Sequence, residues 1–303
     1  MNIAVLGRTG MLYQATLDLI AKGHSIKLIV TSKESREDTR GSKDFNNLAV
    51  DVSAKYLFTA RINERKSLDF IKKIKGLDIG VSMNYVSIIS QDVINLFPCG
   101  ILNAHFGDLP RYRGNACPNW AIINGENSLI LSVHLMEGSL LDCGRVIIQD
   151  ICPVNDSTYI GDIYEWAEKA VPGLFVKAVE LLKKDPGYTL KYADPQSPES
   201  LRCYPRKPQD SRIDWSHPAA AIHRLIRASS EPFSGAYCFV DGKNKLTIWR
   251  AELVNDGERY LAVPGQISAI AKDHFVVITG AGKLKVTKWN SGVKLSSIRQ
   301  RLE

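Results

Sequence analysis

Long apolar runs are missing from this sequence of 303 residues. A membrane-spanning helix needs about 18 or more consecutive apolar residues, and no stretch of the chain approaches that length. A secretory leader is also missing, because Met1–Leu6 enters a strand-like apolar pattern without the basic start and small-residue cleavage site of a signal peptide. We therefore expect a cytoplasmic protein with no membrane insertion.

Paired cysteine motifs are equally absent. The six cysteines are scattered and none forms a Cys-x-x-Cys pair, which argues against a zinc site or a disulfide framework and favours reduced thiols. The glycine turn Gly7–Gly10 lacks the spacing Gly-x-Gly-x-x-Gly, and no acidic residue closes the next expected strand, Ile26–Thr31. We therefore predict neither a metal nor a dinucleotide cofactor.

Net charge is concentrated in the last third of the chain. Residues 1–205 hold 23 Lys and Arg against 23 Asp and Glu, whereas residues 206–303 hold 16 against 9, so the whole net charge of +7 falls on the second part. A basic appendage on a neutral domain is typical of a protein that meets an anionic partner, such as RNA or a diphosphate. A plain solvated surface is the alternative.

Hydrophobic periodicity predicts an α/β domain over residues 1–200. The chain begins with a strand, a helix over Met11–Lys22 and a second strand, and the longest helix is expected over Tyr159–Lys184, where apolar residues recur on one face. Ser32–Asn47 is polar and charged and is interpreted as a mobile loop or a frayed helix, either a plain surface connection or a substrate lid. Residues 186–209 contain five prolines and are interpreted as a linker.

Beyond the linker the pattern changes to short strands. One helix, Pro218–Ser229, precedes five strand-like stretches separated by turns such as Gly280–Gly282. Five short strands of this kind predict a small C-terminal β-barrel, OB-like, over residues 206–303. The strands are expected at Ala236–Val240, Leu246–Glu252, Gly265–Ile270, His274–Thr279 and Lys283–Lys288.

Candidate catalytic residues gather in the stretch Ile101–Gly144. Asn103 and His105 stand two apart at the end of an apolar run, so on a strand both side chains point to one face, at the end where ligands bind in open α/β sheets. Asp142 lies in a glycine-bounded loop between two expected strands, where a carboxylate can hold the His105 ring. A lone histidine on a buried strand is more often a packed core residue, and Asn-x-His alone is a weak motif.

These three side chains together suit acyl-type transfer. An amide stabilises a developing oxyanion, a histidine moves protons, and a carboxylate orients the histidine. Neither Ser nor Cys stands beside His105 at nucleophile spacing. The nucleophile is therefore expected to come from the substrate.

The same stretch resembles a known family, the formyltransferases that use 10-formyltetrahydrofolate. That family includes methionyl-tRNA formyltransferase, glycinamide ribonucleotide formyltransferase and the N-formyltransferases of nucleotide-linked amino sugars. The resemblance covers nearly the whole chain and implies a Rossmann-like catalytic domain followed by the family's carboxy-terminal domain. The motifs that carry it are Asn103–His105, Leu109–Gly114, Trp120–Ile122, Asn124–Glu126 and Leu141–Gly144, together with residues 204–236.

The resemblance implies a role for each matching residue. Asn103 would donate to the oxyanion, His105 would relay a proton from the acceptor amine to the folate nitrogen, and Asp142 would orient His105. The formyl donor would be 10-formyltetrahydrofolate, with no metal. Contacts to the donor are expected from Ser87, Ile88, Ile89, Gly138, Ser139, Leu140 and Leu141, and contacts to the acceptor from Asp108, Arg113, Asn115 and Arg206.

Two of these residues have structural alternatives. Asp108 either meets the acceptor's ammonium or hydroxyl group or caps the following turn. Arg113 either meets a phosphate or the folate tail or bonds to loop carbonyls. Arg206 is predicted to contact a diphosphate or nucleotide.

The acceptor is predicted from departures within the family. The tRNA enzyme usually has Ser-Leu-Leu-Pro after the histidine, where this chain has Phe106–Pro110, and it carries a basic, proline-containing insertion where this chain has the charge-mixed Ser32–Asn47. Asn119–Trp120 and Tyr204–Ser211 are more similar to another member of the family, the formyltransferase that acts on UDP-4-amino-4-deoxy-L-arabinose. These features favour a nucleotide-linked 4-amino sugar made for lipopolysaccharide or another surface glycan.

Two other functions stay open. In the first, the acceptor is initiator methionyl-tRNA, whose phosphates are held by the basic second domain. In the second, the protein is a module that binds folate or a nucleotide sugar without turnover. A homodimer is also left open.

Overall fold

The structure, a computed structural model, describes residues 1–35, 38–138, 140–290, 292 and 294–303. The chain divides into two compact units. The first unit comprises Met1–Cys117, Leu129–Cys152 and Glu165–Cys203, and the second comprises Pro118–Ser128, Pro153–Tyr164 and Tyr204–Glu303. Two short segments of the first 200 residues thus group with the second unit. The boundaries expected at residues 200 and 206 stay a prediction.

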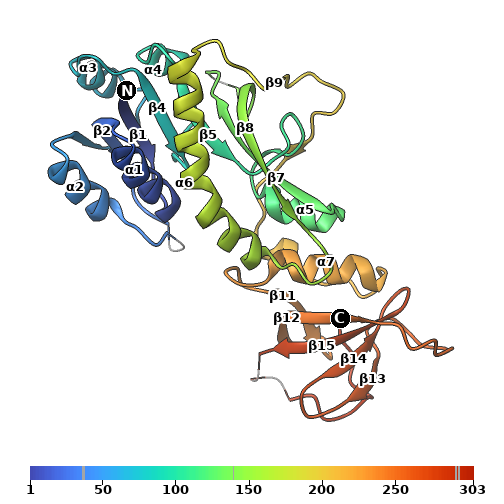
Figure 1. The fold of residues 1–303 in the computed structure, drawn as a ribbon. Coiled ribbons are helices and arrows are strands. Elements are labelled where there is room, and N and C mark those ends of the chain that lie inside the picture. Colours follow the sequence, from blue (N-terminus) through green and yellow to red (C-terminus); the bar gives the residue numbers. More distant parts are fainter. Residues whose placement is uncertain (36–37, 139, 291, 293) are drawn as a thin grey trace. The chain divides into compact units, whose positions relative to one another are not determined.

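The first unit is built on an eight-stranded sheet (Figure 1). Its strand order is β3-β2-β1-β4-β5-β7-β8-β9. Neighbouring strands pair in parallel from β3 to β5, and β5 pairs antiparallel with β7. The strands are β1 (Asn2–Gly7), β2 (Ser25–Thr31), β3 (Lys55–Phe58), β4 (Ile79–Met83), β5 (Ile101–His105), β7 (Ser128–Leu135), β8 (Gly144–Pro153) and β9 (Lys191–Ala193).

Helices cover both faces of this sheet because the strand residues alternate between two cores. Ile3 and Val5 of β1 join a buried cluster with residues of α1, α2 and α6, whereas Ala4 and Leu6 join a second cluster with residues of α3 and α4. This is the doubly wound arrangement that an α/β domain with apolar strands predicts. The helices are α1 (Gly10–Ala21), α2 (Ser42–Asp51), α3 (Arg65–Lys72), α4 (Gln91–Ile94) and α6 (Ile160–Lys184).

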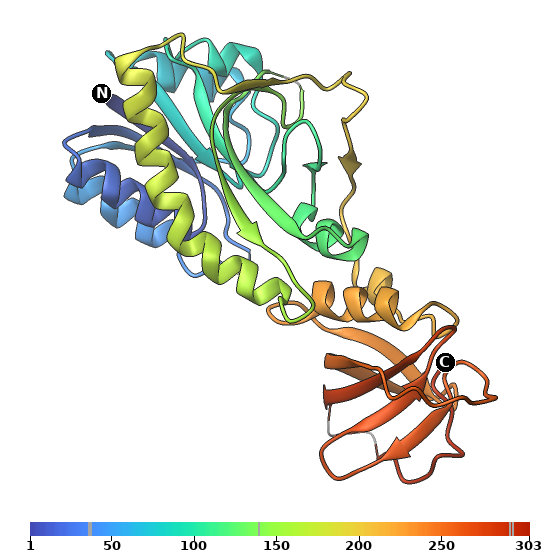
Figure 2. The same ribbon diagram turned by 45° about the vertical axis from the view of Figure 1, so that its right-hand side comes forward.

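The second unit contains a five-stranded antiparallel sheet with the order β11-β12-β15-β14-β13, coloured orange to red in Figure 2. Leu302 bridges to Val240 at the end of β11, and Arg301 bridges to Gln266 beside β13, so the last residues of the chain draw the two edges together. The α/β fold with a small C-terminal β-domain is confirmed. Its elements are α5 (Cys117–Asn124), a 3-10 helix (Pro208–Ser211), α7 (Ala219–Ser229), β11 (Ala236–Val240), β12 (Asn244–Val254), β13 (Ile267–Ile270), β14 (Phe275–Ile278) and β15 (Lys283–Trp289).

Of the two alternatives for Ser32–Asn47, a loop or a frayed helix, the structure has a helix over the second half. Helix α2 begins at Ser42, and Phe45, Leu48 and Ala49 on its inner face are buried in the core. Of the charged residues in this stretch, Lys43 and Asp44 lie in the helix and neither side chain is buried, which is the ordinary pattern of a surface helix. Residues 36 and 37 of the predicted loop lie outside the described residues.

The linker prediction for residues 186–209 is wrong up to Cys203, because these residues belong to the first unit. Strand β9 pairs antiparallel with β8, and β10 (Arg202–Cys203) pairs in parallel with β6 (Arg113–Gly114). Both strands are only two or three residues long, and their partners are distant in the sequence. Local periodicity carries no information about such pairings.

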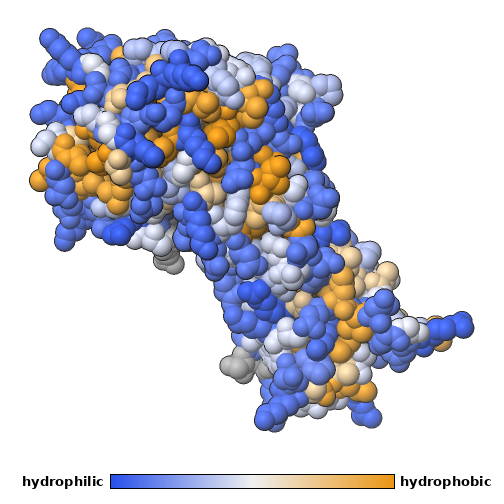
Figure 3. All heavy atoms as spheres, in the orientation of Figure 1, coloured by the Kyte–Doolittle hydropathy of each residue, from blue (hydrophilic) through white to orange (hydrophobic). Residues whose placement is uncertain are grey.

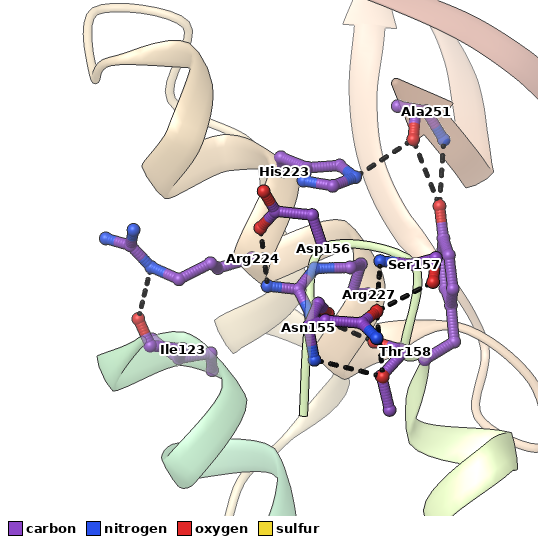
Figure 4. A network of polar contacts seen from close by, with 10 residues as sticks. Ile123, Asn155, Asp156, Ser157, Thr158, His223, Arg224, Arg227 and Ala251 are labelled. Carbon is purple, nitrogen blue, oxygen red and sulfur yellow. Dashed lines mark hydrogen bonds and ion pairs between the residues drawn. The ribbon is translucent and has the colours of Figure 1, made fainter. Parts of the chain in front are cut away.

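A buried arginine organises one end of the second unit (Figure 4). Arg227 of α7 donates from Nη1 to the carbonyl oxygens of Asn155 at 2.7 Å and Thr158 at 2.9 Å. Its Nη2 lies 3.8 Å from a carboxylate oxygen of Asp156. Nearby, Arg224 donates from Nε to the carbonyl oxygen of Ile123 at 3.0 Å. Helix α7 thereby holds the two short segments that lie far from it in the sequence.

Hydrophilic side chains cover much of the face seen in Figure 3, with apolar patches between them. Among the helices of the described residues, none is long and apolar enough to cross a membrane.

Candidate active site

Strand β5 delivers Asn103 and His105 to one face of the sheet. Leu102 and Ala104 belong to the buried cluster that includes α1, α2 and α6. Because side chains alternate along a strand, Asn103 and His105 point to the opposite face, as the sequence predicts. The strand ends at His105, and the chain then turns away from the sheet.

His105 is held from both sides of its ring. Its Nε2 lies 2.6 Å from the carbonyl oxygen of Tyr112, and its Nδ1 lies 3.5 Å from Oδ1 of Asp142. A carbonyl oxygen only accepts, so Nε2 is assigned the proton and donates it to Tyr112. Nδ1, next to the carboxylate, is therefore the ring nitrogen at which His105 can gain or lose a proton.

Asp142 is fixed by the loop between β7 and β8. Its Oδ2 accepts a hydrogen bond from the backbone N–H of Gly114 at 2.8 Å. The preceding carbonyl, that of Leu141, accepts from Nη1 of Arg113 at 3.0 Å. The backbone of Asp142 itself has φ 49, in the left-handed region that Asp tolerates better than most residues. These contacts orient the carboxylate toward His105.

A second histidine, His134, completes the cluster. Strand pairing places His134 of β7 opposite Asn103, and its Nε2 lies 3.3 Å from Nδ2 of Asn103. Its Nδ1 lies 2.9 Å from the carbonyl oxygen of Cys143, so Nδ1 carries the proton and Nε2 accepts from Asn103. Burial lowers the pKa of His134, which favours this neutral form.

The role of His134 was not predicted from the sequence. The available signal was alternation: Leu131, Val133 and Leu135 are buried in the same core as Leu102, which leaves Ser132 and His134 on the other face. What the sequence does not contain is the register that sets His134 beside Asn103. Asn103 keeps one amide hydrogen for His134 and has a second to donate elsewhere.

The turn after His105 depends on Gly107. A Cβ atom on this residue would lie 2.3 Å from the carbonyl oxygen of Tyr112 and 2.9 Å from Nε2 of His105. Both distances are shorter than any real contact of a Cβ atom. Glycine is therefore required for Tyr112 to reach the histidine ring.

Asp108 follows in the same turn and pairs with a cation. Its Oδ1 lies 2.6 Å from Nζ of Lys191 and accepts from Nε2 of Gln149 at 3.3 Å. The Asp108 carboxylate therefore pairs with Lys191 and Gln149, and these contacts are not the cap of the following turn that was the alternative for it. A contact with the acceptor stays a prediction.

Two loops carry the residues expected to contact the formyl donor. Gly138 donates from its N–H to Oε1 of Gln91 at 2.9 Å, and a Cβ on Gly138 would lie 2.3 Å from the backbone nitrogen of Gln91. The loop before Asp142 thus packs against the start of α4, which follows Ile88 and Ile89 in the sequence. Ile88 is 53% exposed and Leu140 is 48% exposed, whereas Ile89 is buried. Apolar side chains left exposed on two adjacent loops suit a flat aromatic ring.

The remaining predicted donor contacts lie in the same loops. Ser87 donates from its hydroxyl to the carbonyl oxygen of Ala60 at 3.2 Å, and Leu141 is held by Arg113. Ser139 lies outside the described residues.

The predicted acceptor contacts are not all brought together. Arg113 donates from Nε to the hydroxyl of Ser200 at 3.0 Å in addition to its bond with Leu141, so it shapes the loop, one of the two roles considered for it. Asn115 is exposed. Arg206 belongs to the second unit, where its Nη2 donates to Ser211 and Ser229 and its guanidinium lies over the ring of Trp120.

No group of three or more His, Cys, Asp or Glu side chains that could hold a metal ion occurs within the described part of the chain. The cluster around His105 instead offers a proton-exchanging imidazole, an oriented carboxylate and an amide with a free N–H. Such an arrangement can carry out general acid–base chemistry on a reaction that develops negative charge on oxygen.

Comparison with known proteins agrees with this chemistry. The family model described as Formyl transferase matches residues 1–179, and the model described as Formyl transferase, C-terminal domain, matches residues 206–301. A methionyl-tRNA formyltransferase from Pelotomaculum thermopropionicum is 28% identical over 292 residues, which cover 95% of this chain and 90% of that protein.

Two solved structures share the fold over almost their full length. WlaRD, a sugar 3N-formyl transferase in the presence of dTDP and 5-N-formyl-THF, has a TM-score of 0.73 and 18% identity, covering 97% of this chain and 99% of that one. The N-formyltransferase from Helicobacter canadensis, in complex with folinic acid and dTDP-3-aminofucose, has a TM-score of 0.70 and 17% identity, covering 95% and 99%. At these identities the likeness establishes the fold.

Proposed function

The chain belongs to the formyl transferase family, and we propose that it transfers the formyl group of 10-formyltetrahydrofolate to the amine of a nucleotide-linked 4-amino sugar. Formyl transfer follows from the family. The observation that carries the site assignment is the contact of Nδ1 of His105 with Asp142, beside an Asn103 amide held by His134. The proposal assigns the reaction to the cytoplasm and its product to lipopolysaccharide or another surface glycan.

The loops described above support binding of the donor there. When bound, 10-formyltetrahydrofolate supplies a formyl group already activated for transfer to an amine. Ile88 and Leu140 offer exposed apolar side chains to its ring, and the loop backbone around Ser87 and Gly138 offers hydrogen-bonding groups. The structures of WlaRD and of the Helicobacter canadensis enzyme, which hold folate compounds, support this assignment by analogy of fold.

Each catalytic residue then has one task. His105 takes a proton from the acceptor amine at Nδ1, and the carboxylate of Asp142 stabilises the positive charge that results. His105 then gives this proton to the folate nitrogen as the bond between that nitrogen and the formyl carbon breaks, so that tetrahydrofolate leaves. Asn103 donates its second amide hydrogen to the formyl oxygen as negative charge develops there. His134 holds the Asn103 amide in the orientation that keeps Nδ2 available.

The distribution of charge in the second unit supports a sugar nucleotide over RNA. The three lysines of β15 are each paired: Lys283 with Asp256 and Glu258, Lys285 with Glu252, and Lys288 with Glu231. Arg206 and Arg227 are committed to hydrogen bonds within the same unit. The excess of positive charge is thus partly used internally, and the β15 lysines do not form a bare basic strip of the kind that RNA phosphates require.

Methionyl-tRNA is the second candidate acceptor. It is favoured by the 28% identity to a methionyl-tRNA formyltransferase over nearly the full length of both chains. It is also favoured by the net charge of +7, all of which comes from residues 206–303.

A single assay separates the two acceptors. Conversion of 10-formyltetrahydrofolate is followed by absorbance with UDP-, GDP- and dTDP-linked 4-amino sugars and with charged initiator methionyl-tRNA, each at low and at moderate salt. We expect turnover with one sugar nucleotide, no turnover with tRNA and a shallow salt dependence. Turnover with tRNA alone, falling steeply as salt rises, would overturn the sugar assignment. The His105→Gln protein serves as the control for background hydrolysis.

A further inference from the structure

The edge strand β9 provides two neighbouring side chains that contact two different parts of the active site, the turn after His105 and the loop that carries Asp142. It pairs with β8 so that Lys191 stands opposite Val146 and Tyr192 opposite Arg145. Successive residues of a strand point to opposite faces. Lys191 contacts the turn that follows His105, and Tyr192 contacts the loop that carries Asp142.

Lys191 begins a continuous polar chain that ends beside the catalytic histidine. Its Nζ lies 2.6 Å from Oδ1 of Asp108, which also accepts from Nε2 of Gln149 at 3.3 Å. The same amide nitrogen donates its other hydrogen to the hydroxyl of Ser132 at 2.8 Å. That hydroxyl donates in turn to the carbonyl oxygen of Gly107 at 2.6 Å.

This chain of hydrogen bonds ends at Gly107, which lies against the catalytic histidine. Gly107 sits against both Nε2 of His105 and the carbonyl of Tyr112, so a shift of its backbone moves the hydrogen bond that orients the ring. Ser132 is also the strand partner of His105. Holding the Gly107 carbonyl therefore holds the imidazole.

Tyr192 contacts the loop that carries Asp142. Its hydroxyl donates to Oε1 of Glu137 at 2.8 Å, and this bond to a carboxylate raises the pKa of Tyr192 to about 12. Glu137 is the second residue of the loop between β7 and β8 that also contains Asp142. The bond therefore tethers that loop to the edge of the sheet.

We propose that Lys191 and Tyr192 are positioning residues for the transfer reaction, with Lys191 fixing His105 and Tyr192 fixing Asp142. The inference rests on the proposed function and adds two residues from a stretch that local sequence pattern assigns to a linker. Catalysis by an oriented histidine and carboxylate requires their separation to be kept within a fraction of an ångström, since a misplacement of about 1 Å can reduce the rate about 100-fold.

The test compares Lys191→Met and Tyr192→Phe with matched changes elsewhere in the first unit. Lys183→Met removes a lysine of α6 that pairs with Glu180 at 3.6 Å, and Tyr13→Phe removes a tyrosine hydroxyl from α1. Each β9 variant is expected to lower kcat about 10-fold with KM for the formyl donor changed less than about twofold. Lys191→Arg should restore most of kcat. The control variants should behave as the wild type.

Thermal stability separates positioning from general damage. Lys191 and Asp108 are 37% and 39% exposed, and exposed ion pairs contribute little to stability. The melting temperature of Lys191→Met should therefore stay close to that of the wild type. A loss of kcat that only follows a loss of folded protein would overturn the proposal.

A second readout does not depend on any acceptor. The ring signals of His105 are assigned in ¹H–¹⁵N spectra of the labelled protein by their loss in His105→Gln. Lys191→Met and Tyr192→Phe should shift these signals, and Lys183→Met and Tyr13→Phe should not. Unmoved signals would overturn the positioning role even if the acceptor is identified. Shifted signals in a protein that turns over no acceptor would uphold it while the proposed function fails.

Discussion

His105 and Asp142 face each other with Nδ1 of the ring 3.5 Å from Oδ1 of the carboxylate. An N–H···O hydrogen bond usually measures about 2.7–3.2 Å, so the pair stands slightly open. Both partners are held by backbone groups, His105 by Tyr112 and Asp142 by Gly114. The backbone thus keeps the carboxylate next to the ring nitrogen that gains or loses a proton.

Replacing the histidine tests the site directly. In His105→Gln the amide can still donate to the Tyr112 carbonyl, but it cannot exchange a proton at the position of Nδ1. We expect kcat/KM to fall roughly 10²–10⁴-fold, the usual contribution of a general acid–base group. Initial rates with the identified acceptor measure this. Turnover near the wild-type rate would show that His105 is a packed core residue.

Replacing Gly107 tests the turn that orients the ring. The Cβ of Gly107→Ala would lie 2.3 Å from the Tyr112 carbonyl oxygen, so that oxygen must move away from His105. We expect kcat to fall about 100-fold. Gly173→Ala is the matched control, because a Cβ there meets nothing within 4 Å and the residue lies in α6. That control should gain about 0.5–1 kcal/mol in the free energy of unfolding and keep full activity. Equal activity of the two variants would refute the role of Gly107.

The buried arginine of the second unit predicts a stability difference between two neighbours on α7 (Figure 4). Arg227→Met leaves the carbonyls of Asn155 and Thr158 without their donor and should cost about 2–4 kcal/mol in the free energy of unfolding. Arg224→Met removes one bond, to Ile123, from a half-buried side chain and should cost about 1 kcal/mol.

Urea unfolding followed by tryptophan fluorescence measures these two variants. Four of the 5 tryptophans, at positions 120, 215, 249 and 289, belong to the second unit, so the signal reports mainly on it. Similar midpoints for both variants would contradict the anchoring role of Arg227.

Two buried histidines predict how stability depends on pH. Burial lowers the pKa of His134 and of His223, and each donates one ring N–H to a backbone carbonyl, that of Cys143 or Ala251. In the unfolded chain both titrate near about 6.5. Below about pH 6.5 the unfolded state binds more protons than the folded state. The contribution of these histidines to the free energy of unfolding is therefore complete above that pH and is lost as the pH falls.

The slope of the free energy of unfolding against pH can be measured. Each such histidine contributes a loss of up to about 1.4 kcal/mol per pH unit below about pH 6.5. Urea midpoints at several pH values between 5.5 and 7.5 should fall with pH for the wild type. His223→Gln should show a shallower slope while its amide keeps the bond to Ala251. An unchanged slope in that variant would mean that His223 is already protonated in the folded state.

The sequence by itself determined the fold class and the catalytic candidates. Apolar runs with period two and long stretches with period 3.6 mark the strands and helices directly, so β1, β5 and α6 are readable without a structure. The spacing Asn103-x-His105 already implies a shared face, because alternation along a strand is a local property. Family motifs then connect this face to Asp142 and to a formyl donor.

Only the tertiary structure decided which side chains meet across distant strands. The register of β5 against β7 places His134 beside Asn103. The pairing of β9 with β8 brings Lys191 to the turn after His105 and Tyr192 to the loop that carries Asp142. It likewise commits Arg206 to hydrogen bonds in the second unit. These contacts depend on pairings between segments far apart in the chain, whose energies come from the packing of whole elements. No local pattern of residues records them.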